Sequence, residues 1–340
     1  MTERREMEGV TTWVYDTKWK GGLTSVSFTP AEGNSAPAYS RSMNYDNLGR
    51  ATSTVTVQAG RSYTNTQTYD AQSRIATATY PSGFTIEHGY NAQGALTTVK
   101  NKATGKVIWQ GNSYNHFGKV TSSTLGNGLS ATLRYDAATG AVREMKAGGS
   151  AAPTAIQNLA YQWDMLNNLT NRSDNNQGLT EGFQYDNLNR LTQTKLNGQT
   201  TQTVAYNRFG NITYKSDVGN YTYAYGRFPH AVAKVEGIKN ATYTYDANGN
   251  MIQGDNRVIN WTSYNYPSQI TYNKLAANGI AAKSATTTFT YGPDRERLTQ
   301  VSNVNGAENT VMFVGAYEET LQGGTVIERI RGYDPYIVNL

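Results

Sequence analysis

The stretch Tyr45-Asp46-Asn47-Leu48-Gly49-Arg50-Ala51-Thr52 contains the pattern on which the fold depends. Asp46 stands at the first position of a type I turn, where a side-chain acceptor is favoured. Gly49 stands where the backbone must adopt a positive φ to enter the next strand. The stretch therefore predicts a β-hairpin with a loop of three to five residues, closed by a G1-type bulge.

The segment after this turn alternates in the manner of a strand. Ala51, Ser53, Val55 and Val57 share one face, and threonines occupy the positions between them. A second reversal is predicted near the middle of each repeat, at Ala59-Gly60, Pro81-Ser82-Gly83, Asn127-Gly128, Gly148-Gly149 and Asn197-Gly198. Each repeat is thus expected to contain two strands and two turns.

The same unit recurs over most of the chain. Its copies begin at Tyr45, Tyr69, Tyr90, Tyr114, Tyr135, Trp163, Tyr185, Tyr206 and Tyr245, with degenerate copies at Tyr15 and Tyr291. Where the glycine is missing, Asn189 and Asn168 or its neighbour Asn167 replace it, since Asn tolerates the left-handed region; Ser73 fits this position less well. A recurring unit predicts one repeat array rather than two domains.

Composition agrees with an all-β array. The 340 residues include 44 Thr, 33 Asn, 33 Gly and 25 Tyr, and only 16% are charged, which is below the usual quarter. About ten repeats predict roughly twenty antiparallel strands, more than an open twisted sheet holds without coiling. Tyrosines at one phase of the repeat are expected to align on neighbouring hairpins as cross-strand aromatic pairs.

Charge and cysteine content narrow the function classes. The net charge of +5 is spread in small clusters, which favours a solvated surface over a nucleic-acid site. The absence of cysteine excludes disulfides and thiolate chemistry. No apolar run is long enough for a membrane span, and no classical signal peptide is recognisable.

The Tyr-Asp-x-x-Gly-Arg-x-Thr unit resembles the YD repeat of Rhs proteins, of the C component of insecticidal Tc toxins and of teneurins. The resemblance extends over residues 11–332 and is more specific in the later part, which is similar to the C-terminal side of a bacterial Rhs core. The segments that carry it are Phe228-Pro229-His230-Ala231-Val232, Tyr243 to Met251, Trp261 to Asn265 and Phe289 to Arg297.

This resemblance implies a continuous antiparallel β-hairpin array coiled into a spiral or cocoon-like shell, complete or partial, that encapsulates a C-terminal polymorphic toxin. Its partners would be the toxin cargo or missing flanking shell segments, with self-association through sheet edges. A specialised secretion system would deliver it to the cell surface or the medium, for interbacterial competition, from a cytoplasmic precursor. We expect a polar lead at residues 1–10, one array at 11–332 and a tail at 333–340.

In that family the shell ends in an Asp-Pro-x-Gly type motif linked to autoproteolysis. Here Tyr333-Asp334-Pro335 gives a truncated version, and no glycine follows it. The chain is expected to be either a fragment of a larger shell or a short natural relative, and to lack self-cleavage.

Candidate catalytic and metal-binding residues are interpreted as structural, so no catalytic, cofactor or metal site is predicted. The histidines His88, His116 and His230 fall in different repeats without zinc-site spacing. Asp246, Asn248 and Asn250 begin like a calcium loop, but Arg257 stands where the bidentate Glu should be. Gly126-Asn127-Gly128 is interpreted as a hairpin turn, and Glu318-Glu319 as a solvated pair on opposite strand faces.

Two other functions remain open. A surface or wall-associated adhesion module could bind carbohydrate through exposed Tyr and Asn side chains in a shallow groove. A β-rich enzyme acting on glycosides would need carboxylates that converge from distant repeats.

Overall fold

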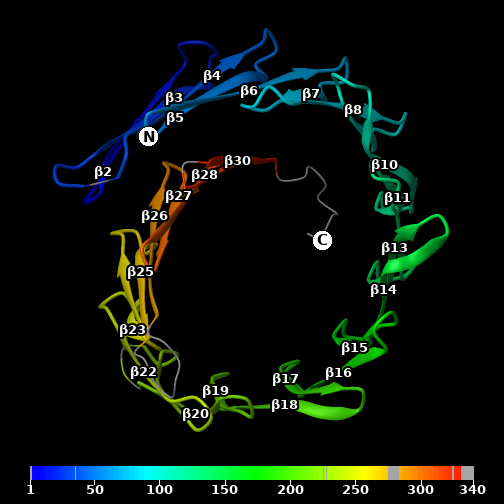
Figure 1. Cartoon of the computed structure of the whole chain (residues 1–340), viewed down its shortest axis with the longest axis vertical. Helices are drawn as coiled ribbons and strands as arrows, with labels where there is room; N and C mark the ends of the chain where they lie inside the picture. Colours follow the sequence, from blue (N-terminus) through cyan, green and yellow to red (C-terminus); the bar gives the residue numbers. More distant parts are fainter. Residues whose placement is uncertain are drawn as a thin grey trace. The chain divides into compact units, whose positions relative to one another are not determined.

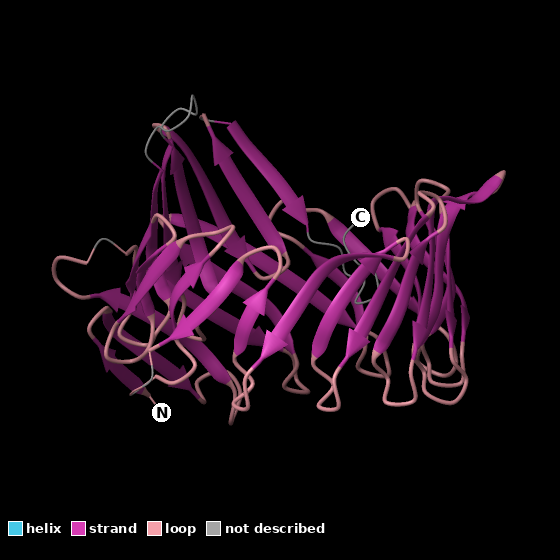
Figure 2. Cartoon of the chain, turned by 90° about the horizontal axis from the view of Figure 1, so that it is seen from below, coloured by secondary structure: helices cyan, strands magenta, loops and turns pink. Residues whose placement is uncertain are grey.

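The structure is a computed structural model that describes residues 2–34, 36–224, 226, 228–274, 283–323 and 325–330. These residues contain thirty strands of one antiparallel sheet and no helix, which confirms the all-β prediction (Figure 2). The truncated motif Asp334-Pro335 lies outside the described residues. Pairing joins strands that follow one another in the chain, as in β4–β5 and β5–β6.

The chain divides into two compact units. The first contains residues 1–85 and 243–340. Its strands are β1 (Glu3–Glu6), β2 (Gly9–Tyr15), β3 (Leu23–Pro30), β4 (Tyr39–Tyr45), β5 (Ala51–Gln58), β6 (Arg61–Tyr69), β7 (Ile75–Thr79), β22 (Ala241–Tyr245), β23 (Met251–Gly254), β24 (Arg257–Trp261), β25 (Pro267–Lys274), β26 (Lys283–Tyr291), β27 (Arg297–Val304), β28 (Ala307–Val314), β29 (Tyr317–Gln322) and β30 (Thr325–Ile330).

The second unit contains residues 86–242. Its strands are β8 (Thr85–Tyr90), β9 (Leu96–Asn101), β10 (Val107–Tyr114), β11 (Val120–Leu125), β12 (Ser130–Tyr135), β13 (Val142–Gly149), β14 (Ala152–Trp163), β15 (Leu169–Asp174), β16 (Leu179–Tyr185), β17 (Leu191–Leu196), β18 (Gln199–Tyr206), β19 (Ile212–Lys215), β20 (Gly219–Tyr223) and β21 (Val232–Glu236).

The repeat turn has the predicted geometry. Tyr45 is paired with Ala51, and the register shifts between Asn44 and Tyr45, as expected for a bulge. Gly49 has a φ of 75°. The substitutes for glycine adopt the same region, with Asn167 rather than Asn168 in this role: Ser73 (63°), Asn167 (65°) and Asn189 (57°). The turn and bulge assignments are therefore confirmed.

Each repeat contains two strands, as predicted, but the estimate of about twenty strands is too low. The array contains two repeats more than the sequence pattern identified. They begin at Tyr223 and Trp261, each of which ends a strand at a bulge. Additional strand pairs lie at both ends of the array, including β1 within the segment predicted to be a polar lead. The strand β1 pairs with β2 between Glu3 and Thr12.

One predicted reversal is misplaced. Gly148 and Gly149 belong to β13, and the turn is formed by Ser150 and Ala151, since Gly149 pairs with Ala152. A Cβ on Gly148 would lie 2.1 Å from the carbonyl oxygen of Ala152. The glycine at 148 thus allows close strand approach rather than a turn.

In the first unit, N-terminal strands pack against C-terminal strands. The blue strands β2, β3 and β4 and the orange strand β27 in Figure 1 include the buried residues Trp13, Val26, Tyr39 and Leu298, which form one apolar cluster. The alternation predicted for β5 is present, but its polar side is the more buried: Thr56 is 5% and Gln58 0% exposed, whereas Val57 is 37% exposed. Much of this contact is consequently polar.

Candidate functional site

In the part of the chain that the structure describes, ten repeats are tied to the preceding one by a hydrogen bond from their aromatic residue. The Oη atom of Tyr206 donates to the backbone carbonyl of Leu191, the first strand residue after the preceding turn, at 2.8 Å. The equivalent bonds join Tyr45 to Leu23, Tyr69 to Ala51, Tyr114 to Leu96, Tyr135 to Val120, Tyr185 to Leu169, Tyr223 to Ile212 and Tyr291 to Pro267. We call this series the aromatic ladder.

Tryptophan replaces tyrosine in the aromatic ladder without loss of the bond. The Nε1 atom of Trp163 donates to the carbonyl of Val142 at 2.7 Å, and that of Trp261 to Met251 at 2.9 Å. The two side chains share an apolar body with a polar donor, which explains why both are accepted at this position. The link between these repeats is a hydrogen bond.

The aspartate of the repeat organises its own turn. Asp186 Oδ1 accepts hydrogen bonds from the backbone NH groups of Leu188 (2.9 Å) and Arg190 (3.0 Å), and Oδ2 accepts one from Arg190 Nε (2.7 Å). The Arg190 side chain, with the backbone donors, holds the pKa of the Asp186 carboxyl below its usual range. The same arrangement is present at Asp46 with Arg50 and at Asp70 with Arg74.

The arginine of the repeat reaches the next turn. The Arg190 guanidinium lies 4.6 Å from the Tyr206 ring centroid, and Nη1 donates to the carbonyl of Asn207 at 3.3 Å. Arg50 lies similarly over Tyr69 at 4.5 Å. The Tyr, Asp, Gly and Arg positions of the repeat thus each have a local structural role.

A second set of contacts joins the N-terminal and C-terminal segments of the first unit. Arg41 pairs with Asp294 at 2.6 Å, and Arg295 pairs with Glu6. Gln58 Nε2 donates to the carbonyls of Leu298 (3.5 Å) and Phe313 (3.4 Å). We call these polar contacts the seam.

The turn between β26 and β27 is specialised for the seam. Gly292 occupies the position of the repeat aspartate and Glu296 that of the repeat arginine. Glu296 Oε2 accepts a hydrogen bond from the Asp294 backbone NH at 2.9 Å, so it replaces the missing aspartate from the opposite side of the turn. A Cβ at Gly292 would lie 2.2 Å from Glu296 Oε1, so a side chain here would displace the Glu296 carboxylate from this position. Asp294 and Arg295 are then free to reach Arg41 and Glu6.

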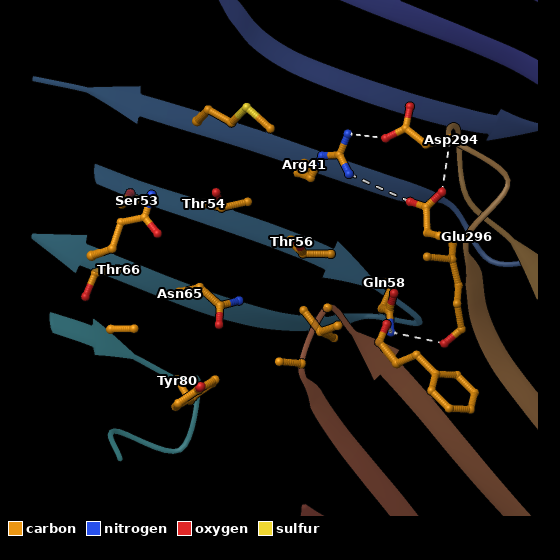
Figure 3. A pocket seen from close by; sticks show the side chains of 18 of the residues that line it. Arg41, Ser53, Thr54, Thr56, Gln58, Asn65, Thr66, Tyr80, Asp294 and Glu296 are labelled. Atoms are coloured by element: carbon orange, nitrogen blue, oxygen red, sulfur yellow. Dashed lines mark hydrogen bonds and ion pairs between the residues drawn. The ribbon is translucent and has the colours of Figure 1, made fainter. Parts of the chain in front are cut away.

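A cavity of about 570 Å³ opens beside this turn (Figure 3). Arg41, Thr56, Gln58 and Tyr80 line one side, and Glu296 lies on the other. Burial raises the pKa of the Glu296 carboxyl. The Glu296 carboxylate accepts a hydrogen bond from the backbone of the turn, however, so we assign it a structural role. Arg41 forms ion pairs with Asp294 and Glu296, so these three charges neutralise one another and need no substrate to pair with.

The pair Glu318-Glu319 is buried, which contradicts the predicted solvated pair. The two residues are 6% and 4% exposed. Glu319 accepts a hydrogen bond from Tyr63 Oη at 2.7 Å and pairs with Arg61 at 2.8 Å. The sequence around Glu319 gives no signal of this burial, because both partners lie more than 250 positions away.

The remaining candidates occupy separate local environments. His88 is buried in β8, His116 lies beside the Phe117 ring in a turn, and His230 Nδ1 is 2.6 Å from Asn211 Oδ1. Asp246 Oδ1 accepts the backbone NH groups of Asn248 and Asn250, as a repeat turn requires. Gly128 closes the turn predicted at residues 126–128, bonding to the Leu125 carbonyl.

Among the described residues, no three His, Asp or Glu side chains gather in a metal-binding group. Within the same residues, no helix has the length and apolarity to cross a membrane.

One of the two unrecognised repeats, that of Trp261, has a signal that could have revealed it. After Trp261, the Thr262 hydroxyl accepts a hydrogen bond from the backbone NH of Tyr266 at 3.0 Å, and Asn265 has a φ of 63°. Thr therefore replaces Asp as the turn acceptor, and Asn replaces Gly. A pattern that allowed Trp, Thr and Asn at these positions would have found this repeat.

The sequence matches no protein-family model and no curated protein. In structure, the chain is similar to the crystal structure of TcdB2-TccC3-Cdc42, with a TM-score of 0.70, 17% identity and coverage of 94% of this chain and 20% of that one. It is also similar to the Tc holotoxin pore of Photorhabdus luminescens, with a TM-score of 0.66, 16% identity and coverage of 93% and 19%. The chain thus has the fold of part of these Tc toxins, as the repeats predicted, and spans about a fifth of their length.

Proposed function

We propose that this chain is a segment of a non-catalytic shell that encapsulates a C-terminal polymorphic toxin and helps to deliver it. The aromatic ladder carries this proposal. Its bonds use backbone carbonyls that every repeat possesses, so the array can extend over many repeats regardless of the other side chains. The likeness to Tc toxin structures over nearly the whole chain supports the same conclusion.

The local chemistry agrees with a container role. The charged groups of the repeats stabilise turns, and those of the seam join strands of the first unit. Because the matched chains are about five times longer, we infer that flanking shell segments complete the enclosure. Export through a specialised secretion system belongs to the same proposal.

Protection of cargo tests this function. The chain would be produced joined to flanking shell segments and a toxin region, and the toxin would be exposed to protease with and without the shell. We expect the enclosed toxin to persist under conditions that degrade the free toxin. Equal degradation rates in the two samples would contradict encapsulation, and retention on a glycan array would favour the adhesion alternative.

A further inference from the structure

The C-terminal strands of the first unit present a hollow on the face opposite the seam. Met312 and Glu319 both contact Tyr63, so they face the N-terminal strands. Their neighbours Phe313 and Glu318 therefore point to the other face, because successive side chains of a strand alternate. That face contains a groove of about 740 Å³. We call it the aromatic groove; its lining includes Tyr266, Phe289, Tyr291, Arg297, Gln300 and Phe313, together with the carboxylate of Glu318, which is only 6% exposed.

Rings form the floor of the aromatic groove. Tyr266 and Tyr291 are stacked, with centroids 5.1 Å apart and planes inclined by 28°, and Tyr266 is 40% exposed. Phe289 and Tyr291, both on β26, line the groove together. Solvent-facing aromatic rings in a concave site provide an apolar surface that a ligand can cover.

Polar groups stand between the rings. The Arg297 guanidinium lies 4.8 Å from the Phe289 centroid and 5.9 Å from that of Phe313. It donates to Gln300 Oε1 at 3.1 Å, and within the described part of the chain no carboxylate pairs with it. Arg297 is exposed, so its guanidinium is available to an acidic group.

The spacing of the strands that carry the rings indicates the shape of the ligand. Tyr291 is on β26 and Phe313 on β28, two strands away, which corresponds to about 9.6 Å across a sheet. A polyproline II helix advances about 9.3 Å in three residues. A peptide of this conformation lying across the strands would place residue i over the stacked Tyr266–Tyr291 pair and residue i+3 over Phe313, with the intervening residues near Arg297.

We propose that the aromatic groove binds a proline-rich peptide segment in the polyproline II conformation, with prolines three residues apart and an acidic residue between them. The rings receive the prolines, as in other aromatic-lined peptide grooves. Arg297 pairs with the acidic residue, and the Gln300 amide is placed to bond the peptide backbone. This binding site is independent of toxin encapsulation.

Fluorescence polarisation with a labelled twelve-residue peptide tests the proposal. The peptide would contain Pro-Glu-Ala-Pro; one control would replace both prolines by alanine, and another would replace the glutamate by lysine. We expect saturable binding of the first peptide only, weakened about tenfold by Tyr266→Ala. Tyr214→Ala, which removes a ring of similar exposure (39%) on β19, should leave the affinity unchanged.

Charge reversal provides a second readout that does not depend on removing a ring. The Arg297→Glu variant should no longer bind the glutamate peptide and should bind the lysine peptide instead. Circular dichroism and the Tm verify that the variant is folded. The proposal is wrong if no peptide saturates at about 1 mM, or if the alanine control binds equally well. It is also wrong if Tyr266→Ala and Tyr214→Ala have the same effect, or if neutral oligosaccharides bind the groove in place of the peptide.

Discussion

Replacing Gly49 by alanine is expected to cost more stability than the same change at Gly210, although both residues occupy the same repeat position. Their φ angles are 75° and 84°, and an L-residue in this region costs about 1–2 kcal/mol. At Gly210 an added Cβ would meet no atom within 4 Å. At Gly49 it would lie 2.4 Å from Cε2 of Trp19. Displacing this half-buried indole adds about 1–2 kcal/mol, giving about 2–4 kcal/mol in total.

Hydrogen exchange measures this difference locally, which suits an array whose repeats open separately. The reporters are the turn amides of residues 49 and 210, which bond to the carbonyls of Asp46 (3.0 Å) and Asn207 (3.1 Å). Gly118→Ala is the matched control, because its added Cβ also meets nothing within 4 Å. Its cost should equal that of Gly210→Ala.

A Trp19→Ala background separates the two contributions. There the substitutions at Gly49 and Gly210 should cost the same, since only the φ penalty remains. Equal costs in the unmodified chain would refute the role assigned to Trp19. A negligible cost at all three glycines would refute the turn geometry itself.

Three further outcomes are expected. Ser73→Gly should raise the free energy of unfolding by about 0.5–1 kcal/mol, because Ser73 has a φ of 63°; unchanged or lower stability in urea denaturation would contradict this. Tyr206→Phe should lower the free energy of unfolding by about 0.5–1.5 kcal/mol, because the hydrogen bond to Leu191 is lost. Coinciding urea denaturation curves for the variant and the unmodified chain would contradict this. The folded-state pKa of Asp186 is lowered, so its contribution to stability is present above the unfolded value of about 3.9 and is lost as the pH falls through the folded value. Arg190→Gln should raise that folded pKa toward the reference in an NMR titration, and an unaltered titration would disprove the assigned cause.

Local features of the fold could be predicted from the sequence because the repeat encodes them within a few residues. The turn of Tyr45 to Ala51 depends on Asp46, Gly49 and Arg50, which contact one another or the adjacent backbone. Periodic alternation likewise identified β5. The repeat identity followed from these local signals.

The seam could not be predicted, because it joins residues far apart in sequence. Arg41 and Asp294 are separated by 253 positions, and nothing near either residue indicates the other. The interpretation of Glu318-Glu319 failed for the same reason, since strand alternation predicts which way a side chain points but not what covers it. The Gly292 and Glu296 exchange was visible as a departure from the repeat, although its meaning required the structure.

The aromatic ladder has a consequence for how such a chain can change in length. Each hydrogen bond of the ladder joins a repeat to the one immediately before it, and its acceptor is a main-chain carbonyl. Removing residues 191–211 would place Ile212 directly after Arg190, where Leu191 now stands, and Tyr223 would keep its acceptor at Ile212. Whole repeats can therefore be gained or lost by recombination without new side chains at the junction. An insertion of a few residues within a turn would instead shift the aromatic residue out of register with its carbonyl acceptor and disrupt the hydrogen bonds of that turn.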